Sequence, residues 1–278
     1  MALPNEPRQF RTLFVSDLHL GSKAARTDMF LDFLKRNDAE TYYLVGDIVD
    51  GWRLKRMWHW PQSHNDVVQK LLRKARKGAR IVYVPGNHDE FLREFPGQHF
   101  GGVEVRRNDV HTTADGRKFL VMHGDEFDIV VRNARLLAYL GDWAYDAAIA
   151  LNLVFNKVRR RLGFPYWSFS SWAKLKVKNA VSFIGAFEEA LALEAKRRGC
   201  EGVICGHIHH AEISTFRGVE YVNTGDWVES CTAVGEHFDG TLELIRWADV
   251  LRDEHAETVV HRLPAARSMA DRRRHEAA

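Results

Sequence analysis

Five short segments of the chain place aspartate, asparagine and histidine side chains directly after apolar runs. Each run is rich in β-branched or aromatic residues and ends abruptly in polar ones, which is typical of a buried strand. In layered α/β folds, sites form beyond the carboxyl ends of strands, so these segments can converge. They are Asp17-Leu-His19, Gly46-Asp47, Gly86-Asn87-His88-Asp89, His123-Gly-Asp125 and Gly206-His207-Ile-His209-His210.

The residue types in these segments suit divalent metals. Oxygen and imidazole ligands without thiolates favour Mn²⁺, Fe or Zn²⁺. A single catalytic zinc uses about three protein ligands, and the larger number of candidates here predicts two ions that share a bridging carboxylate. Two ions about 3.5–4 Å apart can activate a water and stabilise both oxygens of an in-line displacement. The expected chemistry is hydrolysis of a phosphate ester or anhydride.

One such segment alone is weak evidence, since a lone Asp-x-His is mostly a surface or capping pair. All five in this order, each after an apolar run, form a specific signal. The chain here resembles the calcineurin-like metallophosphoesterase superfamily, whose pattern is D-x-H, G-D-x-x-D, G-N-H-D, H-G-D and G-H-x-H. The match runs from Asp17 to His209.

That resemblance implies a role for each matching residue. His88 would lie near the leaving-group oxygen, as general acid or as stabiliser of the charged transition state, and Asp89 would orient it. Asp50 and Asp125 are expected in the second shell, because metal-bound imidazoles commonly donate to a carboxylate. The implied ligands are Asp17, His19 and His209 for one ion and Asn87, His123 and His207 for the other, with Asp47 bridging them.

A closer resemblance is to the UDP-2,3-diacylglucosamine pyrophosphatases of lipid A biosynthesis, and it implies Mn²⁺ and the products lipid X and UMP. The chain departs from that family where His88 replaces the usual Arg, and where Asp50 ends the Ile-Val-Asp that replaces Leu-Phe-Glu. The metal ligands survive both changes, but the identity of the substrate does not follow. The resemblance rests on Ser16-Asp-Leu-His-Leu-Gly21, His123-Gly-Asp-Glu-Phe-Asp128, Thr224-Gly-Asp-Trp-Val-Glu-Ser230 and the place of a helical insertion.

The elements that must position these segments alternate between strand and helix. Helical spacing at 25–36 and 65–77 lies between the first apolar runs, which predicts α/β layers. After Gly206, short strands at 213–216, 219–222, 228–234 and 241–247 predict an antiparallel finish, as a second sheet packed on the first. The expected fold is a four-layer α/β/β/α sandwich.

The expected domains are a metallophosphoesterase core over 8–127 and 199–262, a helical cap inserted at 128–198, and a disordered tail at 263–278. The cap mixes cations with aromatic residues, which can neutralise phosphates and line an acyl groove. An ordinary helical hairpin with a packed inner face remains the alternative. Candidate substrate contacts are Arg160, Trp167, Trp172, Lys176, Lys178 and Asn179.

Composition narrows the class of protein. A net charge of only +3 over 278 residues argues against a dedicated nucleic-acid binder. Three cysteines without a CxxC pair indicate reduced thiols, and the amino terminus lacks an apolar signal core, so a cytoplasmic location is expected. Asp142 and Asp146 interrupt the most apolar stretch, which disfavours a spanning helix and leaves peripheral contact with the inner face of the membrane.

The first functional hypothesis is therefore hydrolysis of a lipid-linked nucleotide such as UDP-2,3-diacylglucosamine by a dinuclear centre. A phosphodiesterase for another phospholipid-like or soluble small diester is the second. A metal-poor scaffold that binds partners would have lost ligand residues, and all seven are present. A nuclease is disfavoured by the nearly neutral charge. The oligomeric state stays open.

Overall fold

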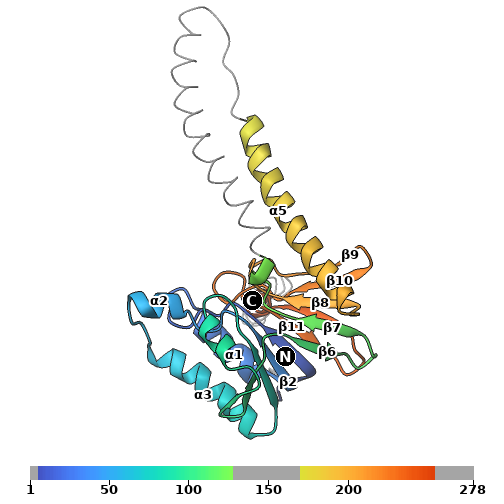
Figure 1. The fold of residues 1–278 in the computed structure, drawn as a ribbon. Helices are drawn as coiled ribbons and strands as arrows, with labels where there is room; N and C mark the ends of the chain where they lie inside the picture. Colours follow the sequence, from blue (N-terminus) through green and yellow to red (C-terminus); the bar gives the residue numbers. More distant parts are fainter. Residues whose placement is uncertain (1–5, 128–169, 254–278) are drawn as a thin grey trace, which may run out of the picture.

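The computed structural model describes residues 6–127 and 170–253, with side chains described from Ile184 onward in the second range. Within these ranges two β-sheets stack face to face, with α1 and α3 on one outer side and α5 on the other (Figure 1). The expected four-layer α/β/β/α sandwich is confirmed.

The first sheet has seven strands in the order β12-β11-β1-β2-β3-β5-β4. Its centre is parallel, and the pairs β1–β11, β11–β12 and β4–β5 are antiparallel. The strands are β1 (Arg8–Val15), β2 (Asn37–Val45), β3 (Arg80–Val84), β4 (His99–Phe100), β5 (Val103–Val105), β11 (Thr232–Glu236) and β12 (Leu242–Arg246).

The second sheet has five strands in the order β6-β7-β8-β10-β9. Its inner pairs β7–β8 and β8–β10 are parallel, and antiparallel strands close both edges. The strands are β6 (Asp109–Thr112), β7 (Lys118–Val121), β8 (Gly202–Cys205), β9 (Glu212–Phe216) and β10 (Val219–Asn223).

The carboxyl-terminal strands do not form one antiparallel unit as the sequence predicts. β9 and β10 close the second sheet, whereas β11 and β12 return to the first, beside β1. The strand expected from residue 228 begins only at Thr232, because Asp226 folds the preceding residues into a turn. Asp226 accepts hydrogen bonds from the backbone of Val228 and Glu229.

Three apolar clusters hold the layers together. One lies between the sheets and includes Phe14 and Val82 from the first and Phe119 and Ile204 from the second. The other two bury the outer faces, one under α1 (Thr27–Arg36) and α3 (Gln62–Arg76), the other under α5 (Ser170–Arg197). Strands buried on both faces need continuous apolar runs, which is why the sequence shows them.

Helix α5 accounts for the described part of the expected cap. Its carboxyl-terminal half packs on the second sheet, and its amino-terminal half extends beyond the sheets (Figure 1). Residues 128–169 of the expected cap, and the expected tail at 263–278, lie outside the described residues. Among the helices of residues 6–127 and 170–253, none is long and apolar enough to cross a bilayer.

Candidate metal centre

The predicted ligands lie in loops at one end of both sheets, after β1, β2, β3, β7 and β8. The loops after β1 and β2 are joined by backbone hydrogen bonds, from Asp17 N to Gly46 O at 3.0 Å and from His19 N to Asp47 O at 2.9 Å. The carboxyl ends of strands in two stacked sheets therefore meet at one place, as layered α/β folds require.

Five of the seven predicted ligands adopt positive φ angles that side chains with a Cβ avoid. Such backbone strain costs about 1–3 kcal/mol per residue and persists where the surrounding structure fixes it. The strain is concentrated at this end of the sheets and turns the side chains toward a common centre. The residues are Asp17 (52°), His19 (51°), Asp47 (54°), His207 (71°) and His209 (53°).

Two glycines make room for this convergence. A Cβ at Gly86 would lie 2.2 Å from Oδ1 of Asp47 and 2.7 Å from Nε2 of His123. A Cβ at Gly206 would lie 2.5 Å from Oδ2 of Asp17. Both positions must therefore lack a side chain for the ligands to occupy their places.

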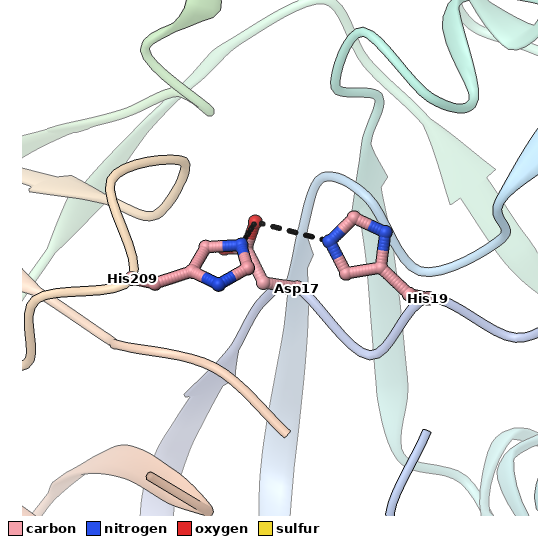
Figure 2. A group of neighbouring side chains, drawn as sticks. All are labelled: Asp17, His19 and His209. Carbon is pink, nitrogen blue, oxygen red and sulfur yellow. Dashed lines mark ion pairs between the residues drawn. The ribbon is translucent and has the colours of Figure 1, made fainter. Parts of the chain in front are cut away.

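Asp17, His19 and His209 form the first group of ligands (Figure 2). Oδ1 of Asp17 lies 3.1 Å from Nε2 of His209 and 3.8 Å from Nε2 of His19, and one potential ligand atom from each residue lies within 4.8 Å of the others. Burial raises the pKa of Asp17, but the hydrogen bond from His209 and the nearby His123 hold that pKa below its ordinary value. The carboxylate is therefore ionised and able to bind a cation.

Asp47, His123 and His207 form the second group. Nε2 of His123 lies 3.4 Å from Oδ2 of Asp47, while its Nδ1 lies 2.8 Å from the carbonyl oxygen of Val45. A donated Nδ1–H fixes the ring so that Nε2 is free to ligate. Oδ2 of Asp47 also lies 4.0 Å from Nε2 of His19, so this carboxylate reaches both groups, as a bridging ligand must.

Several buried atoms of this centre have no hydrogen-bond partner within the described part of the chain. They are Nε2 of His19, Oδ1 of Asn87 and Nε2 of His123. Such orphaned groups are costly unless something else satisfies them. Burial lowers the pKa of His123, but the charge and hydrogen bond of Asp47 and the charges of Asp17 and Asp125 together outweigh burial and raise that pKa to about 10. Positive charge is thus favoured here, and the donor set fits two divalent cations.

His88 lies in the loop after β3, beside Asp50 of the loop after β2. Its Nε2 lies 3.9 Å from Oδ2 of Asp47, and its Nδ1 lies 2.9 Å from Oδ1 of Asp50. Its ring packs edge-on against His19 at 4.7 Å and lies 4.3 Å from the ring of Trp52. The imidazole is therefore held by a buried carboxylate and two rings, with one nitrogen directed at the ligands.

The expectation that Asp89 orients His88 is wrong, because Asp50 makes that contact. The Asp89 carboxylate is fully buried beneath the loops. It accepts hydrogen bonds from the backbone N–H groups of Gly86 at 2.6 Å and Ile48 at 2.8 Å, and from the Tyr83 hydroxyl at 2.5 Å. Asp89 thus fixes the backbone of two ligand loops instead of a catalytic side chain.

Asp125 also differs from the expectation that it accepts from a metal-bound imidazole. His123 directs its Nδ1 to the Val45 carbonyl instead. The Asp125 carboxylate accepts from Nη2 of Arg93 at 2.6 Å, and Arg93 also donates to the Pro85 carbonyl. The pair joins the short helix η2 (Asp125–Phe127) to η1 (Glu90–Glu94), so Asp125 positions loops.

The expected substrate contacts lie outside the side chains that the structure describes. Arg160 and Trp167 lie outside the described residues, and Trp172, Lys176, Lys178 and Asn179 fall on the part of α5 whose side chains are not described.

A contact that sequence reasoning missed is Phe187 of α5. Its ring is fully buried and lies 6.1 Å from the ring of His207, and a Cβ at Gly124 would be 2.7 Å from its Cζ. Phe187, Leu191 and Ala195 are spaced four residues apart and all buried, which marks one helix face. That spacing signals a packed face but does not say what the face contacts.

Comparison with known proteins identifies the family. The calcineurin-like phosphoesterase family model matches residues 10–211. The UDP-2,3-diacylglucosamine hydrolase of Aliivibrio fischeri is 27% identical over 77% of this chain and 90% of its own length. The same-named protein of Psychromonas ingrahamii is 25% identical, over 85% and 97% respectively.

The chain is also similar to proteins with other names. A DNA polymerase II small subunit of Archaeoglobus fulgidus is 27% identical over 79% of this chain and 47% of its own length. Among solved structures, a Vps29 single mutant from Entamoeba histolytica covers 84% of this chain and 97% of its own, at 15% identity and a TM-score of 0.40.

Proposed function

The chain belongs to the calcineurin-like phosphoesterase family, and on that premise we propose that it cleaves the pyrophosphate of a lipid-linked nucleotide. It is a metal-dependent phosphoester hydrolase. The observation that carries two-metal hydrolysis is the position of Asp47, whose Oδ2 lies between the two groups of ligands. Within the class, the names of the relatives from Aliivibrio and Psychromonas support UDP-2,3-diacylglucosamine as the substrate. The products that we expect from it are lipid X and UMP.

Each group of residues has a distinct part in this reaction. Two divalent cations on these ligands would activate a water and neutralise the phosphoryl oxygens. Asp50 accepts a hydrogen bond from Nδ1 of His88 and fixes the orientation of the ring. A proton on Nε2 of His88 can then pass to the departing oxygen. The chain itself therefore supplies the leaving-group side of the displacement.

A second candidate function has its own support. In the lipid A enzymes that the chain resembles, Arg usually stands where this chain has His88, and only His can give up a proton near neutral pH. The His88–Asp50 pair therefore also suits another phospholipid-like diester, or a soluble small one, whose leaving group needs protonation. Both candidates use the same metal centre.

We further propose Mn²⁺ as the physiological metal and the inner face of the cytoplasmic membrane as the place of action. The oxygen and imidazole donors, without sulfur, support Mn²⁺ over a thiolate-preferring ion. Cys200, Cys205 and Cys231 are all free and buried, which suits a reducing compartment. A lipid-linked substrate requires access to a membrane surface. Fe and Zn²⁺ remain the alternative metals.

The proposal is tested by incubating the full chain with Mn²⁺ and UDP-2,3-diacylglucosamine in detergent and detecting products by mass spectrometry. The matched control is Asp47→Ala, which removes the carboxylate between the two groups and should abolish turnover and lower bound metal. UMP and lipid X from the wild type alone are the expected result. If only an aryl phosphodiester is cleaved, the metal centre stands and the second candidate replaces the first.

A further inference from the structure

The short helix α2 (Gly51–Arg56) and the residues after it expose aromatic and apolar side chains beside the metal centre. Trp58 is 75% exposed, Met57 70% and Trp52 44%. Single exposed apolar residues are common, but large ones gathered on one short segment mark an interaction surface. We refer to Trp52, Lys55, Arg56, Met57 and Trp58 as the α2 surface.

The way α2 is anchored explains this exposure. Among the large apolar side chains of α2, only that of Leu54 points toward the protein. A Cβ at Gly21 would lie 2.8 Å from Cγ of Leu54, so Leu54 packs the helix against the loop after β1. The helix ends after six residues, with Met57 N bonded to Arg53 O. Helices α1 and α3 bury apolar faces in the core of the first sheet. α2 is too short to bury a second face, so its remaining large side chains point away.

The charged side chains of this segment are all positive. Residues 51–60 contain Arg53, Lys55 and Arg56 and no acidic residue. Arg53 is paired with Asp50 at 3.4 Å, whereas Lys55 and Arg56 make no ion pair with any described residue. Glu90, on the adjoining η1, is exposed and accepts a hydrogen bond from Trp52, so the cationic region ends there.

We propose that the α2 surface docks the protein on an anionic lipid bilayer. Tryptophan is enriched at the headgroup level of bilayers, and cations beside it are attracted to anionic headgroups. Trp52 joins this surface to the metal centre, because its ring lies 4.3 Å from that of His88. Docking at α2 would therefore hold the centre close to the headgroups, which deepens the proposed function by placing a lipid-linked substrate beside His88.

The test is co-sedimentation of the full chain with vesicles, without substrate or turnover. Wild type should bind phosphatidylglycerol-containing vesicles more tightly than pure phosphatidylcholine vesicles, and added salt should narrow the difference. Lys55→Glu with Arg56→Glu should lower binding to the anionic vesicles at least about thirtyfold, since each surface cation contributes about 1 kcal/mol there. Met57→Ala with Trp58→Ala should weaken binding to both vesicle types.

Two matched controls keep the assignment specific to this surface. Arg76→Glu with Lys77→Glu makes the same charge change on exposed positions of α3 and its end, and Phe238→Ala removes a side chain that is 56% exposed on the β11–β12 turn. Both should bind vesicles as wild type does. Unchanged circular dichroism and unchanged cleavage of an aryl phosphodiester would show that the α2 variants are folded.

Three results would overturn the proposal. The wild type could show no preference for anionic vesicles, the α2 variants could bind vesicles as tightly as the control variants, or the α2 variants could change the oligomeric state of the protein instead of its vesicle binding. None of these depends on the substrate. Loss of vesicle binding in the α2 variants, together with no UMP from the wild type in detergent, would instead reject the lipid nucleotide and keep the docking surface.

Discussion

At the residue scale, the contact between Asp50 and His88 forms the part of the centre to which we assign the leaving group. Nδ1 of His88 lies 2.9 Å from the buried carboxylate of Asp50, and the opposite nitrogen is directed at Asp47. A carboxylate in this position fixes the orientation of the ring. In the proposed mechanism Asp50 therefore acts through His88, as a positioning residue.

The change Asp50→Asn should lower kcat by about a hundredfold to ten-thousandfold on a diester with a poor leaving group, the range for general acid–base catalysis. The loss should be much smaller for a p-nitrophenyl leaving group, which departs without a proton. Rates for both substrates, measured with Mn²⁺ in excess, check this. The double variant Asp50→Asn, His88→Ala should be no slower than His88→Ala, because the pair acts as a unit.

The control for this prediction is Asp89→Asn. Asp89 accepts hydrogen bonds from loop N–H groups and from Tyr83, so its change should lower stability without a preference for one leaving group. Equal losses on both substrates in Asp50→Asn would contradict the role given to His88.

At the element scale, α5 connects the expected cap region to the metal centre. Phe187 packs at the glycine of the loop after β7 and near His207 of the loop after β8. Three further residues of the same face, Leu191, Ala192 and Ala195, are buried on the second sheet. A shift of this helix would therefore displace the loops that carry His123 and His207.

Phe187→Ala should lower the free energy of unfolding by about 3–5 kcal/mol, the range for truncating a buried aromatic ring. It should also weaken Mn²⁺ binding, because the cavity lets the loop with His207 move. Denaturant unfolding and titration with Mn²⁺ measure the two effects. Leu193→Ala, on the exposed side of the same helix, should change neither. Metal affinity that stays at the wild-type value in Phe187→Ala would show that α5 does not position the loop.

At the scale of the whole molecule, a buried acid joins the two sheets. Glu236 of β11 is fully buried, and its carboxylate lies 2.7 Å from Nε2 of His111 in β6 and 2.6 Å from Nη1 of Arg11 in β1. The backbone N–H of Ala114 donates to it as well. β6 belongs to the second sheet and β1 and β11 to the first, so one side chain holds both layers.

Removing this charge should make stability less sensitive to acid. Burial raises the pKa of Glu236, but its polar contacts, led by the hydrogen bond from His111, together outweigh burial and keep that pKa below its ordinary 4.5. A lowered folded-state pKa stabilises the protein above the unfolded-state value, and this contribution disappears as pH falls through the folded-state value. Glu236→Gln should lower the free energy of unfolding by about 3–5 kcal/mol at neutral pH, the range for removing one partner of a buried ion pair.

The difference in the free energy of unfolding between Glu236→Gln and wild type should therefore become smaller as pH falls below about 4.5. Denaturant unfolding at a series of pH values measures it. The comparison variant is Glu243→Gln, which breaks a half-exposed pair with Arg8 and should cost about 0–1 kcal/mol at neutral pH. A gap that stays constant across the pH series would mean that the charge of Glu236 does not stabilise the fold.

Sequence alone predicted the layered fold and the convergence of the candidate ligands, because both depend on local order. Each ligand follows an apolar run, and parallel strands bring their carboxyl ends to one edge, so Asp17, Asp47 and His123 could be placed together in advance. The family pattern then matched over residues 10–211.

Only the tertiary structure decided which groups the carboxylates bond to and which sheet each carboxyl-terminal strand joins. Asp89 directly follows His88 in sequence, yet the turn directs its side chain beneath the loops, while Asp50 arrives from 38 positions away. β11 pairs with β1 across more than 200 positions. Such contacts depend on how the layers stack, and periodicity along the chain reports only which residues are buried.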